Sequence, residues 1–504
     1  MTANLVAALD CHAAERGDRP ALICGTETIA YRELAANSAA VARALAASGI
    51  GPGDRVVHVA ESSSAVYEML YGCARLGAIL VPVNPRLADA EIGYIVAHCR
   101  AGLVVAEDPD RIDITGPVLA SRHFAEWREG AEGTEIPSFP ADSDTRVVQM
   151  YTSGTTGRPK GVVLAHRTFF AVRGLLDAAG LDWIDWRPGD ISLIALPAFH
   201  IGGMWWAAQG LNSGVPNVLL PRFTAAAAIT AVREHGVTVS CFVPAMIQLM
   251  LAEPGFGAVD FATLRKIAYG GSPIGPELLG RAMTTMDCEF AQIYGLTETG
   301  NTAICLPPDQ HTPGQVRWNA AGRPYPGVDL SIRRPDNSQA ETGESGEVYL
   351  RSPAQMLEYH DDPDATAATL VDGWIRTGDA GYLDADGYLV IRDRVKDLII
   401  VAGENVYPAE VEKAINAHPA VLDSAVIGAP DDRWGEAVHA FIVAEPGAEP
   451  PLRDLVRFLN ERLARYKVPL KYEFVTTIPR NPSGKILKRA LRDRFWAGRD
   501  RQVN

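Results

Sequence analysis

The feature that most constrains the fold is an alternation of helical and extended hydrophobic patterns. Tyr31–Ser48 is alanine-rich with apolar residues at helical spacing, and Gly49 supplies a stop. Arg55–Ala60 then has the pattern of a strand. The further helical segments are Ala65–Leu76 and Ala90–Cys99, and the further extended ones are Ala78–Val83 and Leu103–Ala106. This alternation is typical of an α/β domain whose sheets are covered by helices.

The pattern changes near Asp393–Asp397, and 504 residues are about three times the roughly 150 expected of one domain. The segments beyond are a helix (Ala409–Ala417), two strands (Leu422–Gly428 and Ala437–Val443), a helix (Leu452–Ala464) and a basic tail containing Lys488, Arg489, Arg492 and Arg494, which we expect to be solvated. Asp397–Asn504 carries a net charge of +1, against −15 for the remainder. We therefore expect a large α/β domain of sheets flanked by helices, residues 1–395, and a small α+β domain, residues 396–504.

The composition excludes several classes of protein. Hydrophobic residues make up 47% and charged residues 21%, which is ordinary for a globular chain and excludes a largely disordered or collagen-like one. The net charge of −14 argues against a nucleic-acid partner. The most apolar stretch, Tyr67–Val83, contains Glu68 and Arg75, so it reads as a buried helix leading into a strand rather than a membrane span.

The cysteines and the N-terminus indicate the compartment. The seven cysteines are far apart and form no CxxC pair, so neither metal-ligand nor redox spacing is present. Free thiols in a reducing cytoplasm are the simplest interpretation. The first 20 residues show no signal peptide, and we expect a cytoplasmic protein without an integral membrane segment.

The strongest motif is YTSGTTGRPKGV, which follows the apolar strand Val147–Tyr151 directly. Its glycines permit tight turns, its hydroxyls and N–H groups can donate to phosphate oxygens, and Lys160 adds a positive charge. It does not match the Walker A pattern. A bare Ser/Thr/Gly cluster is more often a surface turn, but hydroxyls at four of five positions before Pro-Lys-Gly favour phosphate binding. The residues concerned are Thr152, Ser153, Gly154, Thr155, Thr156, Gly157, Lys160 and Gly161.

This loop resembles the phosphate-binding signature of the adenylate-forming superfamily, which contains acyl- and aryl-CoA synthetases, adenylation domains and luciferases. Further motifs of that family follow in the expected order over nearly the whole chain. The sequence is most similar to fatty-acid and aryl-acid CoA ligases.

The resemblance implies a nucleotide site. In YGLTET, Tyr294 would stack on adenine and Gly295 would belong to the same nucleotide site. Thr297 would contact the α-phosphate, and Glu298 would hold Mg²⁺, for which carboxylate oxygen is a suitable ligand. Thr156 is the second expected metal contact. The segment from Tyr269 would pack against adenine through Gly270, Gly271, Ser272 and Pro273. Asp379 in Thr-Gly-Asp and Arg394 in Arg-Val-Lys-Asp would bind the ribose.

The resemblance also implies a mobile C-terminal domain. Lys485 in Asn-Pro-Ser-Gly-Lys corresponds to the lysine that bridges the substrate carboxylate and the α-phosphate, where a cation offsets developing charge. Lys396 lies at the hinge about which that domain rotates. Gly403 lies in the loop for thioester formation, where a side chain would block the pantetheine arm. The family usually has glycine before the ribose arginine, and here that residue is Asp393.

His200 in Pro-Ala-Phe-His marks the acyl site. Amino-acid-activating relatives have an aspartate there, so its absence argues against an α-amino acid substrate, and the resemblance makes His200 an aromatic gate. A lone histidine or a tryptophan pair is more often structural. The expected acyl-pocket residues are Ile201, Gly202, Trp205, Trp206, Val243, Asn301 and Thr302. The last two hint at a substrate with a polar substituent.

The function implied is that of an ATP-dependent carboxylic acid–CoA ligase. A fatty or aryl acid becomes acyl-AMP and is then transferred to coenzyme A, with ATP, Mg²⁺ and coenzyme A as cofactors. Three alternatives stay open: transfer to a carrier protein, activation of nitrite for aryl diazotisation, and an inactive nucleotide-binding homologue. Luciferase-type oxidation is more distant, and a homodimer stays open as the oligomeric state.

Overall fold

The structure is a computed structural model of the chain. It describes residues 4–112, 116–152, 159–311, 317–318, 320–394, 397–401, 404–431, 433–447, 450–480 and 486–497, with the backbone alone at 394, 405 and 435. The chain divides into unit 1 (Met1–Leu330 and Leu350–Arg376) and unit 2 (Ser331–Tyr349 and Thr377–Asn504). The expected boundary between residues 395 and 396 lies outside the described residues and stays a prediction.

One of the two main sheets of unit 1 has seven strands in the order β18-β8-β7-β4-β3-β5-β6. Its strands are β18 (Glu358–Tyr359), β8 (Lys160–Ala165), β7 (Arg146–Thr152), β4 (Ile79–Val83), β3 (Arg55–Val59), β5 (Leu103–Ala106) and β6 (Val118–Ala120). The pairs from β7 to β6 are parallel, whereas β8 pairs antiparallel with both β7 and β18. The hairpin β7–β8 carries the phosphate-loop motif.

The other main sheet has nine strands in the order β15-β14-β13-β12-β11-β9-β10-β1-β2. Its strands are β15 (Arg323–Pro324), β14 (Ile304–Leu306), β13 (Glu289–Tyr294), β12 (Lys266–Gly270), β11 (Val239–Phe242), β9 (Ser192–Ile194), β10 (Asn217–Leu219), β1 (Pro20–Cys24) and β2 (Glu27–Ala30). Strands β13, β12, β11, β9, β10 and β1 run parallel, so their carboxyl ends meet at one edge.

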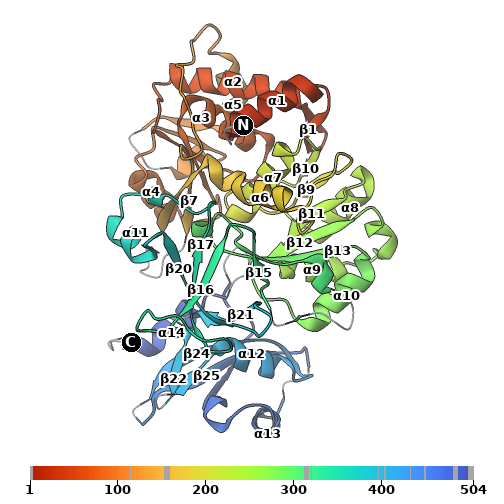
Figure 1. Cartoon of the computed structure of the whole chain (residues 1–504), viewed down its shortest axis with the longest axis vertical. Helices are drawn as coiled ribbons and strands as arrows, with labels where there is room; N and C mark the ends of the chain where they lie inside the picture. The colour runs from red at the N-terminus through yellow and green to blue at the C-terminus, as the bar shows by residue number, and fades with distance from the viewer. Residues whose placement is uncertain are drawn as a thin grey trace. The chain divides into compact units, whose positions relative to one another are not determined.

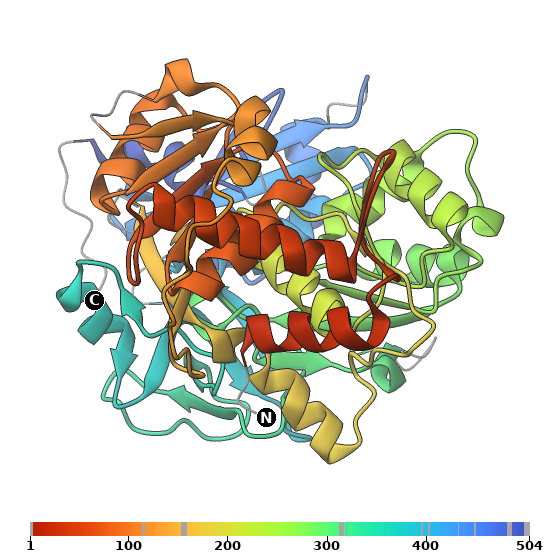
Figure 2. The same cartoon turned by 90° about the horizontal axis from the view of Figure 1, so that it is seen from above.

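The helices of unit 1 include the three that the hydrophobic pattern predicts, at residues 31–48, 65–76 and 90–99. The helices of this unit are α1 (Leu5–Arg16), α2 (Tyr31–Ala47), α3 (Ser64–Leu76), α4 (Asp89–His98), α5 (Phe124–Glu129), α6 (Ala171–Ala179), α7 (Ile201–Asn212), α8 (Ala225–His235), α9 (Pro244–Ala252), α10 (Pro276–Met286) and α11 (Pro363–Thr369). Helices α1 and α2 lie side by side (Figures 1 and 2). Thr224 caps α8 by accepting from the Ala227 amide, and Gly77 ends α3 in the left-handed conformation.

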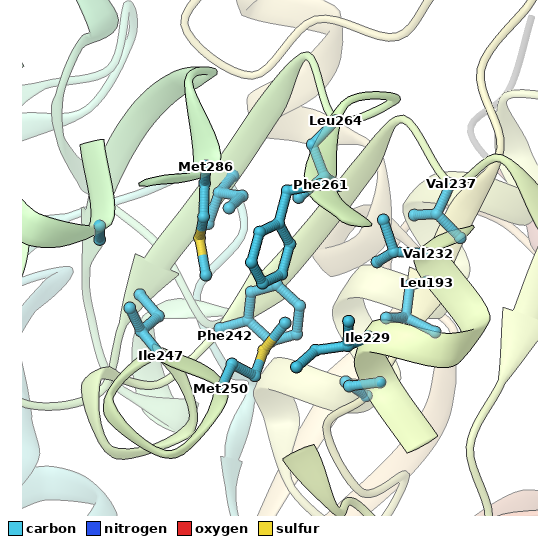
Figure 3. Packing of buried hydrophobic residues seen from close by; sticks show 14 of the residues in the cluster. Leu193, Ile229, Val232, Val237, Phe242, Ile247, Met250, Phe261, Leu264 and Met286 are labelled. Carbon is cyan, nitrogen blue, oxygen red and sulfur yellow. The ribbon is translucent and has the colours of Figure 1, made fainter. Parts of the chain in front are cut away.

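A buried hydrophobic cluster fixes the nine-stranded sheet against its helices. Phe242 of β11 packs with Ile229 and Val232 of α8 and with Ile247 and Met250 of α9 (Figure 3). All five side chains are at most 1% exposed. This packing holds rigid the part of the sheet from which the nucleotide motifs extend.

Unit 2 contains the second, smaller set of elements. Three strands have residues in both units: β16 (Asp329–Arg333), β17 (Gly346–Arg351) and β20 (Trp374–Leu383). The unit 1 residues of β20 pair with β19 (Leu370–Val371). Its unit 2 residues pair with β21 (Leu389–Arg394). A five-stranded sheet contains β22 (Ile399–Val401), β23 (Glu404–Val406), β24 (Val421–Asp431), β25 (Gly435–Ala444) and β26 (Lys471–Phe474), with helices α12 (Pro408–Asn416), α13 (Leu452–Asn460) and α14 (Lys488–Trp496). The α/β fold class is confirmed.

The expectation of a solvated basic tail is wrong for Lys488 and Arg492, whereas the Arg489 and Arg494 side chains are 54% and 50% exposed, as expected. Residues 488–496 form α14, and the Lys488 ammonium lies 3.0 Å from the Glu412 carboxylate with its side chain only 14% exposed. Arg492 pairs with Asp397 at 3.4 Å, and Arg494 pairs with Glu473. Basic residues alone do not reveal such partners, because the matching acids lie far away in the sequence.

Candidate active site

Four of the sequence motifs follow the carboxyl ends of neighbouring parallel strands. Val243 follows β11, the Tyr269 motif runs off the end of β12, and the Tyr294 motif runs off the end of β13. His200 lies beyond β9, the next strand in the same sheet. Ligands of open α/β sheets bind outside the carboxyl ends of the strands, so this edge is the candidate site.

Two glycines in these motifs are required by close backbone contacts. A Cβ atom at Gly270 would lie 2.3 Å from the Ile293 carbonyl oxygen, and one at Gly295 would lie 2.5 Å from the Asn301 carbonyl oxygen. Gly271 has a φ of +83°. A residue with a side chain at position 270 or 295 would therefore collide with the backbone of the neighbouring segment.

The turn that carries Thr297 and Glu298 is held by its own hydrogen bonds. The Thr299 hydroxyl accepts from the Leu296 amide at 2.8 Å, and the Leu296 carbonyl accepts from the Asn301 amide at 2.9 Å. A single 3₁₀ turn spans Thr297–Thr299. The predicted phosphate and metal contacts are therefore presented by a rigid turn.

Tyr359 links this turn to the phosphate-loop hairpin. Its hydroxyl donates to Oε1 of Glu298 at 2.7 Å, and the Lys160 ammonium lies 4.9 Å from its ring centroid. Burial and the Glu298 charge raise the pKa of Tyr359, so the hydroxyl stays protonated and keeps donating. Glu298, Tyr359 and Lys160 thus connect the two main sheets of unit 1.

Sequence reasoning missed Tyr359. It lies in β18, a strand of two residues with no hydrophobic period, and its only local signal is an aromatic residue before His-Asp-Asp-Pro. Its role depends on Glu298, 61 positions away. Periodicity carries no information about such a contact.

The predicted phosphate loop is described only at its stems. Thr152 and Lys160 are partners at the end of the antiparallel β7–β8 ladder. The predicted contacts Ser153, Gly154, Thr155, Thr156 and Gly157 lie outside the described residues. Their roles stay predictions.

His200 is a partly buried, neutral residue at the start of α7. Burial and, secondarily, Arg86 lower its pKa to about 4. Its Nε2 atom is buried and has no hydrogen-bond partner in the described part of the chain. The Phe199 ring lies edge-on at 5.0 Å. The ring is therefore uncharged at neutral pH and able to make a further hydrogen bond.

Some of the predicted acyl-pocket residues are brought together. A Cβ at Gly202 would lie 3.6 Å from Oδ1 of Asn301, and one at Gly271 would lie 3.4 Å from Cγ1 of Val243. Asn301 has a φ of +82°, and its buried Nδ2 finds no acceptor among the described residues. Ile201 begins α7 beside Gly202.

The remaining predicted pocket residues are buried in the fold. The Thr302 hydroxyl donates to the Tyr325 hydroxyl at 3.0 Å, and Thr302 has no exposed surface. Trp205 and Trp206 are 4% and 2% exposed, and the Trp206 ring lies 4.9 Å from Trp186. Ser272 and Pro273, which are predicted to pack against adenine and not to line the acyl pocket, are exposed beyond β12.

The predicted ribose residues face each other in the register of unit 2. Asp379 of β20 and Arg394 of β21 are direct Cα partners in an antiparallel ladder. Asp379 is 5% exposed, and its amide donates to the Thr377 hydroxyl at 3.1 Å. The predicted residues Lys396, Gly403 and Lys485 lie outside the described residues.

Asp393, which stands where the family usually has glycine, has structural partners of its own. Its Oδ2 accepts from the Ala409 amide at 2.7 Å, in the first turn of α12. Its Oδ1 lies 4.0 Å from the Lys488 ammonium. An acid at a helix N-terminus is favourable, so Asp393 ties β21 to α12.

The donor set fits Mg²⁺ as a nucleotide-bound ion. No group of three or more His, Cys, Asp or Glu side chains that could hold a metal is present in the described part of the chain. Mg²⁺ is commonly held by one or two carboxylates together with substrate phosphates. Glu298, with one oxygen engaged by Tyr359, fits that arrangement and leaves the other oxygen for the ion.

Comparison with known proteins identifies the family. The model of the AMP-binding enzyme family matches residues 9–360, and that of the AMP-binding enzyme C-terminal domain matches residues 410–485. The chain therefore belongs to the AMP-binding, adenylate-forming enzymes, which confirms the resemblance. Among the described helices, none has the length and apolar character needed to cross a membrane.

The relatives are acid ligases. The chain is 52% identical to the fatty acid–[acyl-carrier-protein] ligase ScoC of Streptomyces coeruleorubidus, over 99% of this chain and 98% of that protein. It is 36% identical to the long-chain-fatty-acid–CoA ligase FadD13 of Mycobacterium tuberculosis, over 93% of each chain.

Solved structures agree with this assignment. ATP-bound MatB from Rhodopseudomonas palustris matches with a TM-score of 0.90 at 29% identity, over 99% of each chain. The o-succinylbenzoate coenzyme A synthetase of Bacillus subtilis, in complex with ATP and magnesium ion, matches with a TM-score of 0.84 at 31% identity, over 96% of this chain and 98% of that one. The chain is an adenylate-forming acid ligase.

Proposed function

We propose that this protein activates a fatty acid as its acyl adenylate and transfers the acyl group to the phosphopantetheine thiol of an acyl carrier protein. The observation that carries the activation step is the Glu298–Tyr359–Lys160 assembly, where an acid for Mg²⁺ and a cation for phosphate meet. The proposal of a carrier protein rests on the 52% identity to ScoC.

In the first step a carboxylate oxygen of the acid attacks the α-phosphorus of ATP. The bond from that phosphorus to the β-phosphate oxygen breaks, and pyrophosphate leaves. Lys160 and the loop hydroxyls hold the leaving phosphates, and Thr297 with Lys485 offsets charge on the α-phosphate and the carboxylate. Mg²⁺, held by Glu298 and Thr156, would neutralise the leaving pyrophosphate.

In the second step the thiol sulfur attacks the acyl carbonyl, and AMP leaves as its phosphate oxygen departs from that carbon. The thiol proton is lost to solvent. Rotation of residues 396–504 about Lys396 would remove Lys485 and bring Gly403 to the thiol channel. Asp379 and Arg394 would hold the ribose.

The acid lies beside α7. His200 is neutral, and no carboxylate stands at its position to hold an α-amine. The Asn301 amide next to Gly202 favours an acid with a hydrogen-bond acceptor near its chain. Trp205 and Trp206 form the apolar backing.

Coenzyme A is the second candidate acceptor, favoured by FadD13 and by the retained glycine at 403. Both acceptors present the same pantetheine thiol, so the adenylation site does not distinguish them. The two acceptors differ in the molecule to which the pantetheine thiol is attached.

The deciding experiment combines ATP–pyrophosphate exchange with an acceptor panel. Fatty, aryl and amino-aryl acids are tested first for exchange. The acid with the highest exchange is then supplied with a phosphopantetheinylated carrier protein, coenzyme A or nitrite. We expect fatty-acid-dependent exchange and faster thioester formation on the carrier protein. Faster transfer to coenzyme A would overturn the choice of acceptor, and no exchange with any acid would overturn the enzymatic proposal.

A further inference from the structure

The two faces of the β7–β8 hairpin have different roles. Side chains alternate along a strand, so Thr152 and Lys160 share the face that reaches Tyr359, whereas Tyr151 and Gly161 share the opposite face. Gln149 lies on that second face, two residues before Tyr151, and is completely buried. The face away from the nucleotide is therefore polar as well as buried.

Arg55 reaches this second face from β3. Its Nε donates to Oε1 of Gln149 at 3.4 Å, Nη2 donates to Nδ1 of His360 at 3.1 Å, and Nη1 donates to the Gly53 carbonyl at 2.9 Å. All three acceptors are neutral. Within the described part of the chain, no carboxylate lies within ion-pair distance of this guanidinium.

The neighbouring arginines behave differently. Arg146, at the start of β7, pairs with Glu358 at 2.9 Å, and Arg100 pairs with Asp361. Acids are thus close by, yet Arg55 is directed at an amide and an imidazole. Burial and the Arg55 charge lower the pKa of His360, which keeps its Nδ1 available as an acceptor.

The hydrogen bonds continue from Arg55 to the stem of the phosphate loop. Nε2 of Gln149 donates to the Tyr151 hydroxyl oxygen at 3.1 Å, and that hydroxyl is hydrogen-bonded to Nδ1 of His98 at 2.8 Å. Arg55, Gln149, Tyr151 and His98 thus form one connected set of hydrogen bonds, and neighbouring hydrogen bonds in such a set strengthen one another.

Gly161 shows how tightly this network is packed against the hairpin. A Cβ there would lie 2.7 Å from Nε2 of Gln149 and 3.2 Å from Cζ of Tyr151. The Gly161 carbonyl also accepts from the His360 amide at 2.7 Å. Tyr151 and Gly161 are cross-strand partners one residue outside Thr152 and Lys160. The network therefore contacts both stems of the loop.

We propose that Arg55 is a positioning residue for the phosphate loop, which it orients through Gln149, Tyr151 and His360. It touches no substrate. The inference rests on the proposed function, because it needs the loop to bind the phosphates of ATP. Those phosphates are engaged only in the first half-reaction, so Arg55 affects adenylation and not thioester formation.

The test compares Arg55→Met with Arg128→Met. Arg128 is a matched control: its side chain is 16% exposed, and it pairs with Glu68 at 2.7 Å in another part of unit 1. For each variant the KM for ATP in pyrophosphate exchange and the rate of thioester formation from supplied acyl-AMP are measured. We expect Arg55→Met to raise the KM for ATP about tenfold or more, the size of one lost charge-assisted hydrogen bond, with thioester formation within about twofold of wild type.

Two further variants keep the test decisive if Arg55→Met folds poorly. Tyr151→Phe removes one hydroxyl from the network and should raise the KM for ATP severalfold, and Arg55→Lys should restore part of the loss. Equal losses in both half-reactions, or an unchanged KM for ATP in Arg55→Met and Tyr151→Phe, would overturn the proposal. If wild type shows no exchange with any acid, the proposed function fails instead, and calorimetric affinity for an ATP analogue still reports on Arg55.

Discussion

At the scale of single residues, Tyr359 is the group on which most of the site's geometry depends. It joins Glu298, which follows a strand of one sheet, to Lys160, the first residue of β8 in the other. A hydrogen bond to a charged group contributes about 1.5–3 kcal/mol, more than one between neutral groups. Losing it would leave the Glu298 carboxylate free to move away from the position proposed for Mg²⁺.

Tyr359→Phe should therefore lower kcat for ATP–pyrophosphate exchange by about tenfold or more and raise the Mg²⁺ concentration needed for half-maximal rate. The matched control is Tyr67→Phe, which removes a buried hydroxyl that has no partner among the described residues. An unchanged Mg²⁺ requirement in Tyr359→Phe would contradict the assigned role.

Asn301 is the residue from which we expect acid selectivity. Its φ of +82° suits glycine, so Asn301→Gly removes the amide without straining the backbone. We expect wild type to prefer acids with a hydroxyl or keto group over unsubstituted acids of equal length, and the variant to lose about tenfold of that preference in kcat/KM. Thr302→Val is the control, since its hydroxyl is engaged by Tyr325. Retention of the preference in Asn301→Gly would refute this role.

At the scale of elements, Asp393 connects a strand to two helices of unit 2. Asp393 accepts a hydrogen bond from the Ala409 amide of α12 and lies near Lys488 of α14. Lys488 also forms an ion pair with Glu412. Burial raises the pKa of Glu412, and these acids raise the pKa of Lys488 despite its own burial. A family glycine has thus been replaced by a structural acid.

Asp393→Gly should destabilise unit 2 by about 1–3 kcal/mol, because it leaves a helix N–H without its acceptor and weakens the pairing of Lys488. Urea denaturation measures the loss. Asp454→Asn, which breaks an exposed pair with Arg457, should change stability by less than about 1 kcal/mol. Equal effects of the two substitutions would show that the Asp393 contacts contribute nothing specific.

At the scale of the whole molecule, four histidines couple folding to pH. Burial lowers the pKa of His58, His166, His200 and His311 to about 4. In the unfolded chain a histidine titrates near 6.5. Between these values the unfolded chain binds more protons than the folded one, so stability is lost as pH falls from about 6.5 towards 4.

The melting temperature should therefore fall more between pH 7.5 and pH 5.5 in wild type than in His166→Asn. His123, whose side chain is 53% exposed, supplies the control His123→Asn, which should behave as wild type does. A decrease of the same size in His166→Asn and wild type would show that burial of this histidine does not govern the acid sensitivity.

The sequence by itself determined the elements that have a clear hydrophobic period, and it determined the family. Helix and strand periods are local, so the helix predicted at Tyr31–Ser48 is found as α2, and the strand predicted at Arg55–Ala60 is found as β3. The YTSGTTGRPKGV and YGLTET motifs identified the family because they keep their spacing along the chain.

The tertiary structure decided which residues meet. The link from Glu298 to Tyr359, the reach of Arg55 to Gln149 and the ion pair of Lys488 with Glu412 join positions 61 to 94 residues apart. In the folded chain the Thr302 hydroxyl is also hydrogen-bonded to Tyr325, and residues 488–496, expected as part of a basic tail, form helix α14. Local pattern could not show these contacts, because they depend on how the sheets and helices pack, and packing brings distant side chains together only once the chain has folded.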